Sequence, residues 1–233
     1  MSTRERVFDA LSGVRDPELD EPITSLRFVS SCTVSQDGDV EVLLRLPTPQ
    51  CAPNFAFLMA ADARDAVRRL PEVRAVSVQL EDHFTGEEIN AALGRGEGFT
   101  GAFPGETDDD RLDSLRELFR RKALLARQGR VCQSLLADGQ DAADVVALTV
   151  AELPPGPETN RCLELRAELG LPDDEHSPGL IAGDGASLTA ETLNPWLRRA
   201  RLVSLSLESN GGICRSLLRV RHGVADPTEE MPR

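Results

Sequence analysis

Apolar residues in the first third of the chain change from helical to strand-like spacing. Val7, Leu11 and Val14 recur at the spacing of one helical stripe, and Thr3 can cap this first helix. Two runs with period-two spacing follow, and the Asp-Gly pair in segment 36–39 between them is typical of a hairpin turn. The first run contains Leu26, Phe28, Cys32 and Val34, and the second contains Val40, Val42, Leu44 and Leu46. The pattern predicts a helix followed by a β-hairpin.

A second helix and a third strand are expected after a proline-rich bend at 47–53. The inner face of that helix begins at Phe55, and Pro71 ends it. Residues 73–80 then have the composition of a third strand. A strand–helix–strand unit of this length implies a crossover, which places the third strand parallel to the second. Residues 1–93 are therefore predicted to form a small α/β domain with the order helix, hairpin, helix and strand.

The remainder of the chain is predicted to be mainly helical. Glycines are dense in segment 94–106, which we interpret as a connector, and residues 107–222 form the helical extension. The three aspartates after Thr107 favour a helix start there, because acidic groups stabilise the positive end of a helix. Further helices are expected at 131–137, 141–149, 158–169, 189–200 and 213–221, with a strand at 201–208 and a frayed tail at 223–233. The predicted fold class is α+β.

Charge and hydropathy exclude several classes of partner. The formal net charge is −13, which repels phosphate backbones and disfavours nucleic acid as a partner. No apolar run approaches the roughly 20 residues that a membrane-spanning helix needs. Residues 1–11 carry charges and lack the apolar core of a signal peptide. We therefore expect a cytoplasmic protein that binds neither nucleic acid nor membrane.

The cysteine pattern argues against common zinc and redox motifs. Five cysteines occur, and none forms a CxxC pair, so a zinc ribbon or a thioredoxin-type site is disfavoured. Cys32 shares the parity of a strand's apolar face, which indicates a core thiol. Cys132, Cys162 and Cys214 fall on predicted helices and are expected to pack, and no spacing supports a cluster formed by one of them with Cys51.

Cys51 is the cysteine most suited to chemistry. It follows the second predicted strand and precedes the second predicted helix, where unpaired N–H groups stabilise a thiolate. Pro47, Pro49 and Pro53 restrict the conformations of this loop. A partly exposed thiolate here can ligate a soft metal or attack a disulfide. The alternative is a small residue that only occupies the helix start.

Two further groups are candidates at the same end of the predicted sheet. Asp16-Pro17-Glu18 follows the first helix, and its carboxylates could supply oxygen ligands or accept a proton near Cys51. The alternative is a turn in which Asp16 caps the bend. His83 follows the third strand beside two acidic residues and could bind metal, although a solvated turn is the more economical interpretation.

These motifs together resemble a known family. Residues 7–80 are similar to the iron–sulfur assembly domain of the PaaD/SufT-like family of metal–sulfur cluster biosynthetic proteins. The motifs that carry the resemblance are Asp16-Pro17-Glu18-Leu19, Ile23-Thr24-Ser25-Leu26, Pro49-Gln50-Cys51 and Leu70-Pro71-Glu72-Val73. The chain departs from the family pattern at Pro47, where threonine is usual, and at Ala52, where proline is usual.

The resemblance implies an accessory role in maturing metalloproteins rather than an enzymatic activity. It implies Cys51 as the cofactor-binding residue, and Cys51, Asp16 and Glu18 as metal ligands for iron or an iron–sulfur cluster held transiently. The region after Phe84 resembles an extension of family members associated with di-iron monooxygenases, which implies a hydroxylase as client.

Two hypotheses of different kinds follow. In the first, the chain carries iron or a cluster on Cys51, with a homodimer as one way to complete the coordination, because one cysteine cannot complete a cluster. In the second, the chain is a metal-free adaptor or chaperone that holds an apo-metalloenzyme. A thiol redox enzyme is a weaker third hypothesis, because no resolving cysteine is near in sequence.

Overall fold

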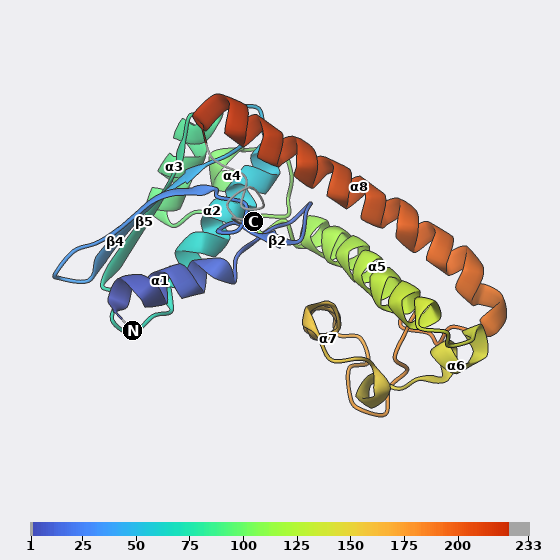
Figure 1. The fold of residues 1–233 in the computed structure, drawn as a ribbon. Coiled ribbons are helices and arrows are strands. Elements are labelled where there is room, and N and C mark those ends of the chain that lie inside the picture. The colour runs from blue at the N-terminus through green and yellow to red at the C-terminus, as the bar shows by residue number, and fades with distance from the viewer. Residues whose placement is uncertain (1, 224–233) are drawn as a thin grey trace. The chain divides into compact units, whose positions relative to one another are not determined.

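The structure, a computed structural model, describes residues 2–223 (Figure 1). The chain forms two compact units. One unit contains the residues up to Ser114 together with those from Asn210 onward, and the other contains Leu115–Ser209. The first unit is therefore built from two separate stretches of sequence. This grouping into compact units does not test the domain boundaries predicted at residues 93 and 106, which stay predictions.

The first unit contains a three-stranded sheet, a small hairpin and several helices. Its elements are α1 (Thr3–Ser12), β1 (Arg15–Asp16), β2 (Glu21–Pro22), β3 (Val29–Val34), β4 (Asp39–Arg45), α2 (Pro53–Arg68), β5 (Ala75–Glu81), α3 (Gly86–Arg95), α4 (Phe99–Ala102) and the last part of α8 (Ala190–His222).

The three-stranded sheet confirms the topology predicted from the sequence. Its strand order is β3-β4-β5, with β3 antiparallel to β4 and a bulge between Val29 and Ser31. β5 runs parallel to β4, so that Val42 lies opposite Val78, and α2 forms the crossover between them. Gly38 closes the β3–β4 turn at a φ of +84°, and a Cβ there would lie 2.6 Å from the carbonyl oxygen of Glu72.

The core of the first unit lies between the sheet and the helices α1 and α2. These helices contact each other, α1 also contacts β3, and α2 contacts β5. Val42 and Leu44 on β4 are fully buried, as are Val7 and Leu11 on α1. Ser2, rather than the predicted Thr3, caps α1 and forms a capping box with Glu5.

The second unit is helical. It contains α5 (Asp113–Ala137) from Leu115 onward, α6 (Ala142–Ala147), η1 (Val150–Glu152), α7 (Pro157–Leu169) and the part of α8 that precedes Asn210. Its largest buried cluster contains Val131, Cys132, Leu135, Val145, Leu153, Leu180, Leu188, Leu193 and Leu197. The mainly helical extension and the α+β class are confirmed.

A buried arginine joins several segments of the second unit. Arg166 on α7 has no exposed surface. Its terminal nitrogens donate hydrogen bonds to the carbonyl oxygens of Pro172, Pro178 and Gly179 and to the side-chain oxygen of Gln128. Burial lowers the pKa of Arg166 from its usual value. One side chain therefore donates hydrogen bonds to three carbonyl groups of the loop that follows α7.

Three predictions for the extension are wrong, and one of them concerns the helices at 189–200 and 213–221, which are parts of the single helix α8 rather than separate elements. The strand predicted at 201–208 is helical and belongs to α8. Leu197, Ala200 and Ser204 are buried at spacings of three and four, which is the period of a helix, whereas Leu202 is 69% exposed. The separate helix predicted at 131–137 is the last part of α5.

The helix predicted to start at Thr107 begins six residues later, at Asp113. Leu112 has a φ of +54°, which breaks helical geometry just before that start. Both oxygens of Asp109 accept hydrogen bonds, one from the N–H of Asp113 and one from the N–H of Ser114. An aspartate of the predicted acidic run therefore does cap this helix.

The predicted connector at 94–106 contains the end of α3 and the short helix α4. Phe99 of α4 is buried and packs edge-on against Phe57, with 5.5 Å between the ring centroids. Of the predicted frayed tail, residues 224–233 lie outside the described residues. No helix within residues 2–223 is both long and apolar enough to cross a membrane.

Candidate functional site

Cys51 lies in the loop that joins β4 to α2. Its N–H donates to the carbonyl oxygen of Thr48 at 3.3 Å, which closes a tight turn. The Thr48 hydroxyl lies 3.7 Å from the Cys51 sulfur. Ala52 precedes α2 and Pro53 is its first residue, as proline commonly is. The thiol is partly exposed, so an incoming metal or partner can reach it.

Three hydrogen bonds from other elements hold this loop. The N–H of Phe84 donates to the carbonyl oxygen of Pro49 at 2.8 Å. Arg221 of α8 donates to the carbonyl oxygen of Pro47 at 3.0 Å. The third bond joins Nε2 of His83 to the carbonyl oxygen of Cys51 at 2.9 Å. The loop therefore presents its thiol from a backbone that is fixed at both ends.

His83 positions Cys51 through its backbone. Its Nδ1 accepts from the N–H of Thr85 at 3.3 Å, so the proton of the neutral ring is on Nε2, which donates to Cys51. Both ring nitrogens of His83 are thus engaged in hydrogen bonds, one with Cys51 and the other with Thr85. In this arrangement His83 is a support for Cys51 and has no free nitrogen for a metal.

Asp16 and Glu18 lie in the small hairpin formed by β1 and β2. Oδ1 of Asp16 accepts hydrogen bonds from the N–H groups of Glu18 and Leu19, at 2.8 and 2.9 Å. Asp20 adopts a φ of +52°, and its N–H returns to the carbonyl oxygen of Asp16. Asp16 does cap the bend, as one of the two interpretations of this motif predicts.

Asp16 is also a buried acid with an unused oxygen. Only 8% of its surface is exposed. Burial raises the pKa of its carboxyl to about 6, the two backbone N–H groups oppose that shift, and the charges of Glu18 and Glu21 add to it. No donor among the described residues reaches Oδ2. A carboxyl whose pKa is shifted by burial is a common feature of functional sites.

Cys214 of α8 joins this cluster, and sequence reasoning missed it. Burial, together with the negative charges of Asp16, Cys51 and Glu18, raises the pKa of the Cys214 thiol to about 12, and Arg215 opposes the shift. Asn210, one turn earlier on α8, donates to a carboxylate oxygen of Glu18 at 3.1 Å. The prediction that Cys214 merely packs overlooked these neighbours, because nothing in a helical spacing reports contacts with residues that far away in the chain.

The other three cysteines are core residues, as predicted. Cys32 on β3 and Cys132 and Cys162 in the second unit are buried. Burial raises the pKa of Cys132 to about 11 and that of Cys162 to about 12, which keeps both thiols protonated and unreactive.

The donor set fits iron chemically but is not assembled around a metal. Thiolates are ligands for iron and iron–sulfur clusters, and carboxylates are ligands for iron ions. Across residues 2–223, no group of three or more His, Cys, Asp or Glu side chains is arranged to hold a metal ion. The predicted ligand set of Cys51, Asp16 and Glu18 therefore stays a prediction.

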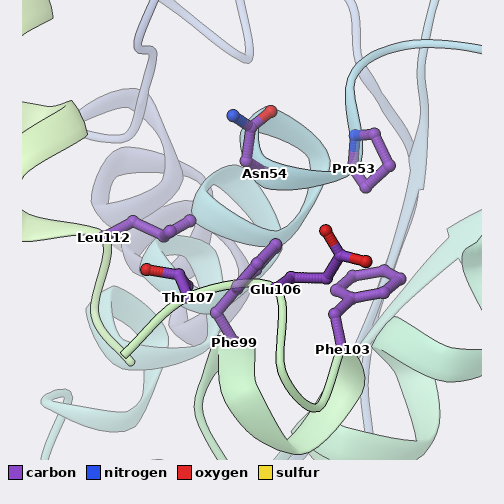
Figure 2. A pocket seen from close by; sticks show the side chains of 7 residues that line it. All are labelled: Pro53, Asn54, Phe99, Phe103, Glu106, Thr107 and Leu112. Atoms are coloured by element: carbon purple, nitrogen blue, oxygen red, sulfur yellow. The ribbon is translucent and has the colours of Figure 1, made fainter. Parts of the chain in front are cut away.

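A pocket of about 510 Å³ opens next to the start of α2, two residues after Cys51. Figure 2 shows the carboxylate of Glu106 beside the ring of Phe103, on the side toward Pro53. The walls are otherwise largely apolar. Its lining residues are Pro53, Asn54, Phe99, Phe103, Glu106, Thr107 and Leu112.

Comparison with known proteins identifies the family. Residues 4–80 match the model of the iron–sulfur cluster assembly protein family. The chain is also 33% identical over 93 residues to the uncharacterized protein MJ1129 of Methanocaldococcus jannaschii, a match that covers 40% of this chain and 96% of that protein. Through its N-terminal part, the chain belongs to the iron–sulfur cluster assembly protein family. The matched segment 4–80 includes Asp16, Glu18 and Cys51, whereas Cys214 lies outside it.

Proposed function

We propose that this chain is an accessory factor that helps to assemble iron–sulfur or di-iron centres in a client metalloenzyme. Membership of the assembly family supports the general role. The observation that carries the specific proposal is the partly exposed thiol of Cys51 on a loop that is held by three hydrogen bonds. In this proposal Cys51 holds iron or a cluster transiently, and the chain has no catalytic residue.

The chemistry of such a carrier requires a ligand that both binds and releases. A thiolate binds iron strongly, and a partly exposed one leaves coordination positions open to a client's ligands. The carboxylates of Asp16 and Glu18 can supply oxygen ligands or accept the proton that Cys51 loses on binding. We propose a di-iron monooxygenase hydroxylase as the client, on the basis of the resemblance of the extension.

Anaerobic reconstitution of the full-length chain with iron and sulfide tests the carrier. The readouts are visible absorption and the number of iron atoms retained after desalting. We expect iron on the native chain and its loss from Cys51→Ser. Cys32→Ala, which removes a buried thiol of the same unit, should retain iron. Retention of all iron by a folded Cys51→Ser variant would contradict the proposal.

The second candidate is a metal-free adaptor that holds an apo-metalloenzyme. It is favoured by the pocket at the start of α2, which can receive a client's side chain. Its mostly apolar walls and Glu106 suit an apolar side chain with a basic end. If Cys51→Ser supports client metallation as well as the native chain, the adaptor is the better account. A defect in Glu106→Arg with normal iron binding would support the same conclusion.

A further inference from the structure

The pocket next to the start of α2 is lined by residues of the first unit alone. Figure 2 shows Pro53 and Asn54 of α2 on one side of it and Phe99 and Phe103 on the other. Its volume of about 510 Å³ lies within the range of roughly 300–1,000 Å³ that is usual for ligand sites. The pocket is therefore large enough for a long side chain of a partner.

Contacts within the first unit form the apolar floor of this pocket. Phe99 is buried and packs edge-on against Phe57, and its ring centroid lies 4.9 Å from that of Phe103. The N–H of Phe99 donates to the carbonyl oxygen of Asp110 at 2.9 Å, and the N–H of Thr100 donates to Oδ1 of Asp110 at 2.9 Å. These bonds join α4 to the loop before α5, so the pocket is formed without a partner.

A tight turn places the carboxylate of Glu106 beside an aromatic ring. The N–H of Glu106 donates to the carbonyl oxygen of Phe103 at 3.3 Å. Pro104 is the second residue of this turn and Gly105 is the third, with a φ of +84°, which is the pattern of a type II turn. Figure 2 shows the result, with the carboxylate of Glu106 next to the ring of Phe103.

The segment that forms this side of the pocket is acidic. Residues 96–110 contain five acidic residues and no basic one. Asp109 and Asp110 accept hydrogen bonds from N–H groups of the fold. The carboxylate of Glu106 is exposed, and within residues 2–223 it has no hydrogen bond or ion pair. The pocket thus offers a negative charge that no described residue neutralises, which favours a cationic group as its occupant.

A carboxylate beside an aromatic ring, next to apolar walls, is suited to a guanidinium group. A guanidinium can donate two parallel hydrogen bonds to one carboxylate, and its weakly hydrated plane stacks on aromatic rings. The methylene stem of an arginine side chain covers apolar surface at the same time. A small hydrated ion would leave the aromatic walls unused.

We propose that this pocket is the docking site for an arginine side chain of the client. The guanidinium pairs with Glu106, and the stem lies on Phe99 and Phe103. That the arginine belongs to a client rests on the proposed function, whereas guanidinium binding follows from the pocket itself. Cys51 precedes Pro53 by two residues, a span of at most about 7 Å of chain, so the docked segment lies beside the thiol.

Calorimetric titration of the full-length chain with Nα-benzoyl-arginine amide tests the pocket. Nα-benzoyl-citrulline amide is the matched control, because citrulline has nearly the shape of arginine without its charge. We expect the citrulline probe to bind about tenfold more weakly. Glu106→Gln should weaken arginine binding by a similar factor and leave citrulline binding unchanged. Glu88→Gln, which removes an exposed carboxylate of α3 outside the pocket, should match the native chain.

Equal affinity of the native chain for the two probes would overturn the arginine site, and so would native arginine binding by Glu106→Gln. Phe103→Ala should weaken the binding of both probes, because it removes a wall that both contact. The comparison of the two probes uses the native chain, so it tests the site even if a variant does not fold.

Anaerobic iron reconstitution separates this inference from the proposed function. Glu106→Gln should retain iron, and Cys51→Ser should bind the arginine probe as tightly as the native chain. A native chain that retains iron but does not distinguish the probes would overturn the docking site and leave the carrier. A native chain that distinguishes the probes but retains no iron would overturn the carrier and leave the arginine site.

Discussion

Arg166 in the second unit and Asp16 in the first are both buried ionisable side chains, and their surroundings differ. Arg166 in the second unit has no exposed surface and donates four hydrogen bonds to neutral oxygens. Asp16 in the first unit is nearly as buried, but both of its hydrogen bonds reach one oxygen, and its charged neighbours are acidic. The two terminal nitrogens of Arg166 are thus compensated by acceptors of the fold, although its Nε is buried without a hydrogen-bond partner, whereas the charged neighbours of Asp16 oppose its ionisation.

The difference separates a structural charge from a functional candidate. A buried charge surrounded by complementary partners fixes the loops that supply those partners. A buried charge that keeps like-charged neighbours lowers stability, and such arrangements are typical of sites that bind or react. The comparison therefore predicts that removing the buried charge lowers the free energy of unfolding of the second unit and raises that of the first.

The largest effect is expected from Arg166→Met. This variant removes the Arg166 donor of three loop carbonyls and one of the two donors to the side-chain oxygen of Gln128. We therefore expect a loss of about 3–5 kcal/mol in the free energy of unfolding of the second unit. Trp196, the only tryptophan, packs against the core of this unit, so its fluorescence during urea unfolding measures the change. Arg198→Met, at an exposed position of α8, should change stability by less than about 0.5 kcal/mol. Equal stability of the two variants would show that Arg166 does not stabilise the second unit.

A smaller effect of opposite sign is expected from Asp16→Asn. Asparagine keeps an oxygen for the two backbone N–H groups and removes the buried charge, so the metal-free first unit should gain on the order of 1–2 kcal/mol at pH 7. Hydrogen exchange of the amides of β4 and α2 measures this unit, which contains no tryptophan.

The gain from Asp16→Asn should depend on pH in a defined direction. The folded-state pKa of about 6 lies above the ordinary value of 3.8, so the native chain loses stability as pH rises from about 4 through 6. The variant lacks this loss. The difference between the two proteins should therefore be small at pH 4 and reach its full size above pH 7. A stability difference that does not change with pH would show that burial of the charge is not its cause.

The smallest effect on stability is expected from Arg221→Met. Its ion pair with Asp82 is partly exposed, so we expect a loss of less than about 1 kcal/mol. The same change removes one of the three hydrogen bonds that hold the Cys51 loop, and the amides of 48–52 should exchange faster. Arg74→Met removes an exposed pair with Asp39 and should leave that exchange unchanged. Unaltered exchange in Arg221→Met would show that the other two bonds suffice to hold the loop.

The strands and helices of the first unit could be predicted well, because each is marked by a pattern over a few neighbouring residues. Period-two apolar runs, an Asp-Gly turn and Pro71 define its strands and second helix. The position of Cys51 between β4 and α2 follows from the same order. The strand predicted at 201–208 failed because Leu202 and Leu205 are exposed positions of a long helix, and alternation over a few residues does not distinguish the two.

The missing parts of the site depend on contacts between distant segments. His83 reaches Cys51 from beyond β5, and Asn210 of α8 reaches Glu18 in the acidic hairpin. No spacing in the sequence reports these contacts, because each depends on how the chain returns to the first unit. Local patterns therefore singled out Cys51, Asp16 and Glu18 as candidates, but they did not indicate that His83 supports the Cys51 loop.

The return of α8 to the first unit has a consequence for the order of synthesis. The first unit is interrupted after Ser114 and resumes at Asn210, so the ribosome makes the whole second unit before the last piece of the first. A nascent chain that ends between these points carries Cys51 and Asp16 but lacks Cys214, Arg215 and Arg221. Because domains fold during translation from the N-terminal end, the newborn protein passes through a stage with Cys51 in place and acquires Cys214 only after the second unit has been made.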